Sequence, residues 1–96
     1  MSNQTTLASE ELQIRNVLKS RKATYGCYEH NAYVSQNLKD ILYERYKDNL
    51  SKVHREALEM ICHKMSRIVN GDPDYVDSWV DIIGYAQLVV DYIEEK

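Results

Sequence analysis

The residues that interrupt helices are rare in this chain, and they fall at the ends of apolar repeats. The only proline, Pro73, and two of the three glycines, Gly26 and Gly71, separate segments whose hydrophobic residues recur every three or four positions. Proline suits the first turn of a helix, and glycine suits the residue just after one. No segment shows the alternation that is typical of a strand. The sequence therefore predicts an all-α fold.

Four helices are expected, in a single bundle-like domain. They span about residues 10–22, 29–46, 52–69 and 73–94, with Ser9 and Ser51 as caps of the first and third. Residues 1–9 are predicted to form a flexible N-terminal lead, and residues 10–96 the helical domain. A 96-residue chain has a thin core, and its last helix is apolar around most of its circumference. We therefore expect a homo-oligomer to complete the bundle.

Composition excludes several classes of protein. The net charge of −3 and the pI near 5.5 disfavour a nonspecific nucleic-acid binder, which usually carries a basic excess. No run reaches the roughly 18 apolar residues of a membrane span, and "MSNQTTLASEE" does not resemble a signal peptide. Cys27 and Cys62 lack metal or redox spacing, and the three histidines lack zinc-site spacing. A cytoplasmic protein with reduced thiols is expected.

Two pairs of acids lie one helical turn apart on the last two helices. Glu56 and Glu59 share a side of the third helix, and Asp77 and Asp81 share a side of the fourth together with Gly84. If an antiparallel pairing brought these stripes face to face, the four carboxylates would suit Mg²⁺, or Mn²⁺, with a substrate's phosphates completing the coordination. The alternative is ordinary solvated helix surface, especially for the two glutamates.

Basic and aromatic residues near these acids offer further ligand contacts. Lys64 and Arg67 lie on or beside the acidic side of the third helix and are candidates to bind phosphate. The chain has eight tyrosines, one tryptophan and no phenylalanine, and tyrosine suits stacking on a base or packing at an interface. Tyr25, beside Gly26, and Tyr85 are the two expected to contact a ligand. Most of the other aromatic residues are expected to fill the core.

Two stretches resemble known proteins. "KATYG" and "REALEMICHKMSRIVNGDPDYVDSWVDIIGYAQLV" are similar to a family of short, uncharacterised phage and prophage proteins, over about Leu12 to Ile93. More distantly, the chain resembles the all-α, MazG-like nucleotide pyrophosphohydrolases. That resemblance implies a dimer or tetramer that uses Mg²⁺ to cleave nucleoside triphosphates to monophosphate and pyrophosphate. A phage origin would place the protein in the cytoplasm of its bacterial host.

The resemblance also implies roles for individual residues. The family holds Mg²⁺ through an ExxE on one helix and an ExxD on the next. Glu56 and Glu59 match the first motif, and Asp81 matches the final acid of the second. Ser78 stands at the position of the missing first acid, and Asp77, one residue earlier, is its nearest replacement.

Three functions are compatible with the sequence, and the first of them is the one predicted. The first is a Mg²⁺-dependent nucleoside triphosphate pyrophosphohydrolase in which the four acids hold the metal, and the retained acids favour it. The second is a non-catalytic nucleotide-binding oligomer that sequesters a host immune nucleotide signal, and Ser78 favours it. The third is a structural interaction module in which the acids form surface or interfacial pairs.

Overall fold

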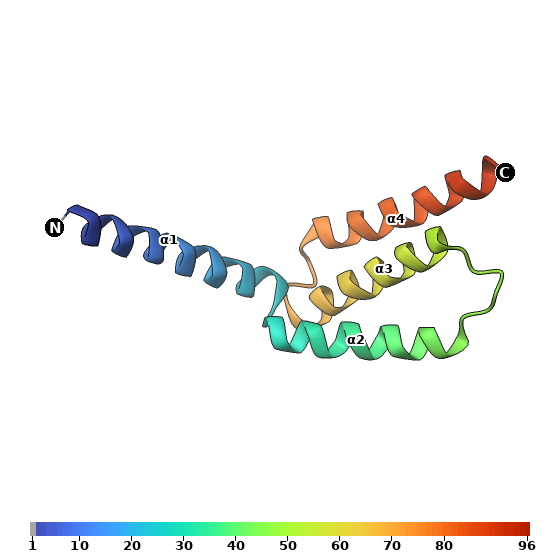
Figure 1. The fold of residues 1–96 in the computed structure, drawn as a ribbon, viewed down its shortest axis with the longest axis horizontal. Coiled ribbons are helices and arrows are strands. Elements are labelled where there is room, and N and C mark those ends of the chain that lie inside the picture. The colour runs from blue at the N-terminus through green and yellow to red at the C-terminus, as the bar shows by residue number, and fades with distance from the viewer. Residues whose placement is uncertain (1) are drawn as a thin grey trace.

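The computed structural model describes the backbone of residues 2–96 and the side chains of residues 9–96; Met1, the first residue of the predicted lead, lies outside the described residues. It contains four helices: α1 (Ser2–Tyr25), α2 (Tyr28–Arg45), α3 (Lys52–Asn70) and α4 (Val76–Glu94). The described residues form no strand. The predicted all-α class with four helices is confirmed (Figure 1).

The first helix begins earlier than the sequence suggested. α1 starts at Ser2, so Ser9 lies within the helix and does not cap it. The predicted flexibility of residues 1–9 stays a prediction. At α3 the expected cap is confirmed, because the Ser51 side chain accepts a hydrogen bond from the His54 N–H at 3.3 Å. The His54 ring in turn accepts from the Ser51 N–H at 3.1 Å.

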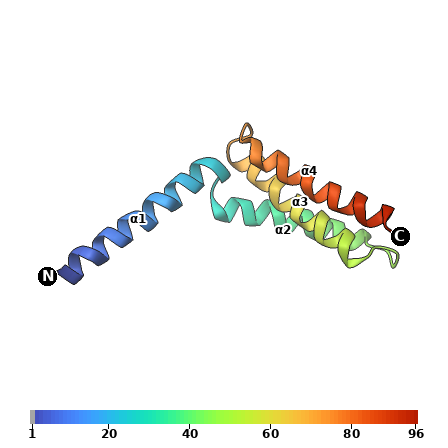
Figure 2. The same cartoon turned by 90° about the horizontal axis from the view of Figure 1, so that it is seen from above.

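The helices form an open arrangement. α3 lies between α2 and α4, each antiparallel to it, while α1 extends away from this three-helix layer (Figures 1 and 2). α2 and α4 do not pack against each other, and α4 packs only on α3. The chain measures 62 × 28 × 26 Å with a radius of gyration of 18.1 Å. A compact chain of this length would have about 12–13 Å.

The layer buries few apolar side chains. Ala57, Cys62 and Ile68 of α3 are the buried hydrophobic residues among those described. The seam between α2 and α3 also buries Asn31, Ser35 and Ser66. Small side chains at such a seam allow two helices to approach closely. The core is therefore thin, as expected for a chain of this size.

The apolar face of α3, formed by Leu58, Ile61, Met65, Ile68 and Val69, is partly uncovered. Leu58 and Ile61 are half-buried and Ile68 is buried, but Met65 is 42% and Val69 69% exposed. The neighbouring helices lie on the two flanks of α3, toward α2 and toward α4, and no helix of the chain covers the face between those flanks. Part of this apolar face is therefore exposed in the single chain.

Two glycines join the ends of the layer. Gly26, between α1 and α2, has φ of +87°, a conformation that favours glycine. A Cβ there would lie 2.4 Å from the carbonyl oxygen of Asn70, and a Cβ on Gly71 would lie 2.4 Å from that of Thr24. The Asp72 N–H donates to the same Thr24 carbonyl at 2.8 Å. The α1–α2 and α3–α4 turns are thus in direct backbone contact, which fixes the position of Tyr25.

Candidate functional site

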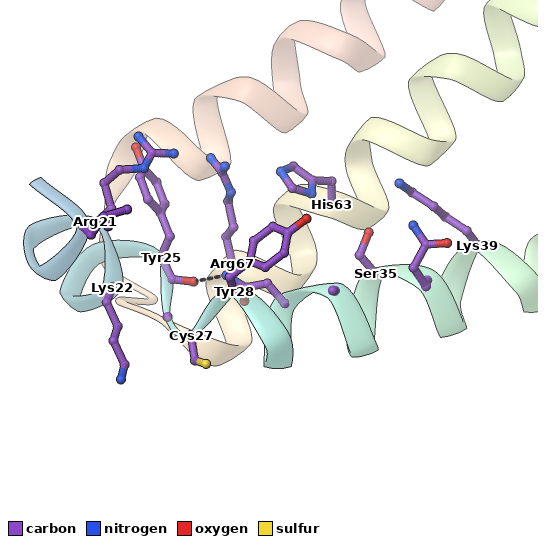
Figure 3. Close-up of a pocket in the computed structure, with 14 residues that line it drawn as sticks. Arg21, Lys22, Tyr25, Cys27, Tyr28, Ser35, Lys39, His63 and Arg67 are labelled. Carbon is purple, nitrogen blue, oxygen red and sulfur yellow. Dashed lines mark hydrogen bonds between the residues drawn. The ribbon is translucent and has the colours of Figure 1, made fainter. Parts of the chain in front are cut away.

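A pocket of about 440 Å³ opens where the end of α1 meets the first half of α2 and the last half of α3 (Figure 3). Pockets that bind small ligands usually measure about 300–1,000 Å³. We call this the basic pocket, because five of its lining residues carry a cationic or imidazole side chain: Arg21, Lys22, Lys39, His63 and Arg67. None of the described residues that line it is an aspartate or glutamate.

The cationic groups of the basic pocket have no carboxylate partners within the described part of the chain. The one salt bridge among the described residues joins Lys64 Nζ to Asp81 Oδ2 at 3.0 Å, on the α3–α4 side. The arginine and lysine side chains of the basic pocket therefore keep their charges available to a ligand. Unpaired cations gathered in a concave surface attract anions more strongly than the same cations scattered over a convex one.

Tyr25 organises the two arginines. The guanidinium carbons of Arg67 and Arg21 lie 4.3 Å and 5.0 Å from the centre of its ring. The Tyr75 ring packs edge-on against Tyr25 at 5.6 Å. Guanidinium groups stacked on an aromatic face keep their N–H edges free to donate hydrogen bonds. Both arginines are thus oriented without losing their capacity to bind an anion.

Buried polar side chains form the floor of the basic pocket. Asn31 is 7% exposed; its amide donates to the Tyr25 carbonyl at 2.7 Å and its oxygen accepts from the Asn70 amide at 3.0 Å. Ser35 is 3% exposed and also lines the pocket, but its Oγ has no hydrogen-bond partner among the described residues. Buried hydroxyl groups are nearly always paired, so an unpaired one beside a pocket is a donor ready for a ligand.

The electrostatics around His63 show how positive this region is. Burial lowers the pKa of His63 below its usual 6.5, and the charges of Arg67, Lys64 and Lys39 lower it further. His63 is therefore neutral at neutral pH. An anion in the basic pocket would offset the neighbouring positive charges and raise the pKa of His63.

This arrangement is suited to a phosphorylated ligand. Arginine binds phosphate through two parallel N–H···O bonds, and lysine adds a point charge. Tyr28, 83% exposed at the rim, and the Tyr25 ring offer aromatic surface for a base. Two of the predicted ligand residues, Tyr25 and Arg67, therefore come together here. Lys64, predicted beside Arg67, instead forms the salt bridge with Asp81.

The four predicted metal ligands are not brought together within the chain. Asp81 pairs with Lys64, and Asp77 accepts a hydrogen bond from the Tyr75 hydroxyl at 3.1 Å. Glu56 lines a groove between α3 and α4. Glu59 lies on the α2 side near Tyr46, whose pKa is raised by its own burial and then by the charge of Glu59.

Among the described residues, no three His, Cys, Asp or Glu side chains gather as a group that could hold a metal ion. The side chains of one chain thus do not fit the Mg²⁺ site. The physical reason is the register of α4 on α3: Asp81 lies opposite Lys64, whereas Glu56 lies opposite Tyr85, about one helical turn further along α4.

Other predicted features of α4 also lie away from the basic pocket. Tyr85 is half-buried and lines the apolar groove with Glu56, so it does not meet Tyr25. Ser78, at the position of the missing family acid, is 4% exposed. Gly84, which shares the side of Asp77 and Asp81, has no atom within 4 Å of an added Cβ.

The sequence analysis missed Asn31, Ser35, Lys39 and His63. A signal for part of this set was present: His63 and Arg67 are one turn apart on one side of α3. On α2, Ala32, Ser35, Gln36 and Lys39 recur at helical spacing, with small residues between larger polar ones. Only the packing of α2 on α3 shows that the two sets line the same pocket.

Residues 12–92 match the family described as a domain of unknown function, DUF6378, so the chain belongs to that family. No curated protein and no solved structure matches the chain. None of the helices in the described part of the chain is long and apolar enough to cross a membrane.

Proposed function

We propose that this DUF6378 member binds the phosphate groups of a nucleotide in the basic pocket and does not hydrolyse it. The observation that carries the proposal is the composition of that pocket: five basic side chains, two tyrosines and no acidic side chain among its described lining residues. Phosphate groups need cationic hydrogen-bond donors, and a base needs an aromatic surface.

Binding without turnover is favoured by where the acids lie. Hydrolysis of a triphosphate needs a group that activates water, commonly a metal ion held by carboxylates. The acids of this chain lie outside the basic pocket and are separated from one another. A protein that holds a nucleotide without consuming it lowers the free concentration of that nucleotide. Together with the resemblance to short phage proteins, this favours the sequestration of a host immune nucleotide signal in the bacterial cytoplasm.

The proposal is tested by incubating the purified protein with Mg²⁺ and a mixed pool of linear and cyclic nucleotides. Mass spectrometry of the solution and of the heat-released ligand then reports turnover and binding separately. We expect an unchanged nucleotide to be recovered from the protein. A triphosphate converted to monophosphate and pyrophosphate, with the conversion lost in Glu59→Gln, would instead establish the pyrophosphohydrolase. If no nucleotide is recovered from the protein and none is converted, the proposed function of the basic pocket is wrong.

A matched pair of variants places the ligand. Arg67→Gln removes a guanidinium that stacks on Tyr25 in the basic pocket, whereas Arg55→Gln removes one that stacks on Tyr46, 5.0 Å from its ring centre, near the other end of α3. Both variants change the net charge equally. We expect Arg67→Gln to weaken nucleotide binding by about 10- to 100-fold, since a charge-assisted bond is worth roughly 1.5–3 kcal/mol. Equal losses in both variants would point to nonspecific attraction.

A further inference from the structure

One face of the three-helix layer is apolar, and no part of the described chain covers it. Successive residues of a helix are rotated by about 100°, so a residue two positions after a pocket-facing one points to the opposite side of the layer. On α3, Met65 and Val69 stand in this relation to His63 and Arg67, which line the basic pocket. Both Met65 and Val69 are exposed.

The same rotation places residues of α2 and α4 on this face. On α2, Leu38 and Ile41 follow two positions after the pocket-lining Gln36 and Lys39. On α4, Asp81 pairs with Lys64, which is next to the pocket-lining His63 in the sequence. Ile83 follows two positions after Asp81 and therefore points to the opposite side of the layer. The α4 stripe continues at spacings of four, three, four and three residues, the repeat of a helix that packs against another helix. The apolar face comprises Val34, Leu38, Ile41, Leu58, Ile61, Met65, Val69, Trp79, Ile83, Ala86, Val90 and Ile93.

The exposure of this face is larger than a monomer normally shows. Seven of its large side chains are between 42% and 69% exposed. From Trp79 to Ile93 the face is about 20 Å long at 1.5 Å per residue. Three helices spaced 8–10 Å apart make it about 25 Å wide, or ~500 Å² in projection. Accessible area follows the side-chain contours and is larger, so the face approaches the ~800 Å² per partner of a stable complex.

The chemistry of the face indicates the occupant. None of its twelve residues is charged, so a second copy of the face meets it without repulsion between its own side chains. Only three hydrophobic residues are buried among side chains 9–96, so the fold needs further cover, and another copy of the chain is always present. A layer of helices that is apolar on one side is stable when it packs on a second layer.

We propose that the apolar face is the contact surface of a two-fold symmetric homodimer, in which it packs against the same face of a second copy. The basic pocket lies on the opposite side of the layer, so each copy keeps its own pocket open to solvent. This inference does not depend on the ligand or on the proposed function.

Sedimentation equilibrium of the full chain at micromolar concentration tests the proposal, with Ile83→Glu and Val80→Glu as a matched pair. Ile83 is 66% exposed on the apolar face; Val80 is 52% exposed on the same helix but points away from α3, at the edge of the layer. We expect a wild-type dimer, a dissociation constant raised at least ~100-fold by Ile83→Glu, and a change below ~3-fold for Val80→Glu. A monomeric wild type, or equal effects of both variants, would overturn the proposal.

A second measurement keeps the test decisive if Ile83→Glu does not fold. A mixed sample of isotope-labelled and unlabelled wild type should give intermolecular NOEs to the Met65 methyl group, and their absence would refute the face-to-face contact. Ile14→Glu, on the exposed part of α1, should leave the dimer intact. Dissociation by this variant would show that α1 of the second copy covers the face, which would overturn the proposed packing.

Discussion

The three glycines of this chain make a quantitative test of the fold, because their surroundings differ so sharply. Gly71 has a negative φ of −117°, so no positive-φ penalty applies, but an added Cβ would lie 2.4 Å from the Thr24 carbonyl oxygen. Ordinary contact begins at 3.4 Å, so the two turns must separate by about 1 Å. The 2.8 Å hydrogen bond from Asp72 to Thr24 would be lost with that movement.

The expected cost follows from these terms. Overpacking costs typically ~1–3 kcal/mol and a lost hydrogen bond ~0.5–1.5 kcal/mol, so Gly71→Ala should destabilise the fold by about 2–4 kcal/mol. Gly26→Ala adds the penalty of a positive φ, about 1–2 kcal/mol. In contrast, Gly84 lies within α4 with open space around it, and Gly84→Ala should stabilise the fold by about 1 kcal/mol.

Thermal unfolding followed by circular dichroism, at one fixed protein concentration, measures all three effects. For a domain of this size, 1 kcal/mol corresponds to a change in Tm of about 4–8 °C. Gly84→Ala should therefore unfold at a higher temperature than the wild type, and the other two variants well below it. If Gly71→Ala remained within 0.5 kcal/mol of the wild type, the two turns would not be in contact.

Three further predictions concern titration, reactivity and the ion pair. Because the pKa of His63 is lowered in the folded state, the unfolded state binds more protons just below pH 6.5, and the unfolding free energy should fall as the pH drops through that value. In urea titrations, His63→Gln should remove this part of the pH dependence of the unfolding free energy. Cys27 lines the basic pocket, whereas Cys62 is buried and its pKa is raised chiefly by that burial. Iodoacetamide should therefore modify Cys27 alone, and more slowly when nucleotide is bound; mass spectrometry measures both effects. Asp81→Asn should cost at most about 1 kcal/mol in chemical denaturation, because its carboxylate is 46% exposed and its pairing with Lys64 is screened by solvent; a larger loss would give the pair a structural role.

The sequence predicts the elements of this fold better than their arrangement. Gly26, Gly71 and Pro73 correctly mark the joints, because glycine and proline act through local backbone geometry. The extension of α1 away from the other helices could not be predicted in this way. It depends on which helices pack against one another, and the apolar residues of α1, such as Ile14 and Val17, remain exposed.

The candidate site was predicted only in part for a similar reason. Arg67 and Tyr25, selected from charge and from the glycine beside the tyrosine, line the same pocket. Their contact with a ligand stays a prediction. Lys39 and His63 were missed because their shared position depends on how α2 packs on α3. The acids were grouped by their spacing along each helix, but the register of α4 on α3 places Asp81 opposite Lys64 and Glu56 opposite Tyr85. Periodicity identifies the side of a helix, and packing decides what that side meets.

The two faces of the layer together explain why α3 carries both an apolar and a charged stripe. Its flanks are occupied by α2 and α4, which leaves Met65 and Val69 on one free face and His63 and Arg67 on the other. A helix in the middle of a four-helix bundle would not expose both of these faces to solvent. The apolar stripe therefore indicates cover from outside the chain, while the basic stripe indicates a ligand. If both proposals hold, a 96-residue chain uses one face for stability and the opposite face for binding.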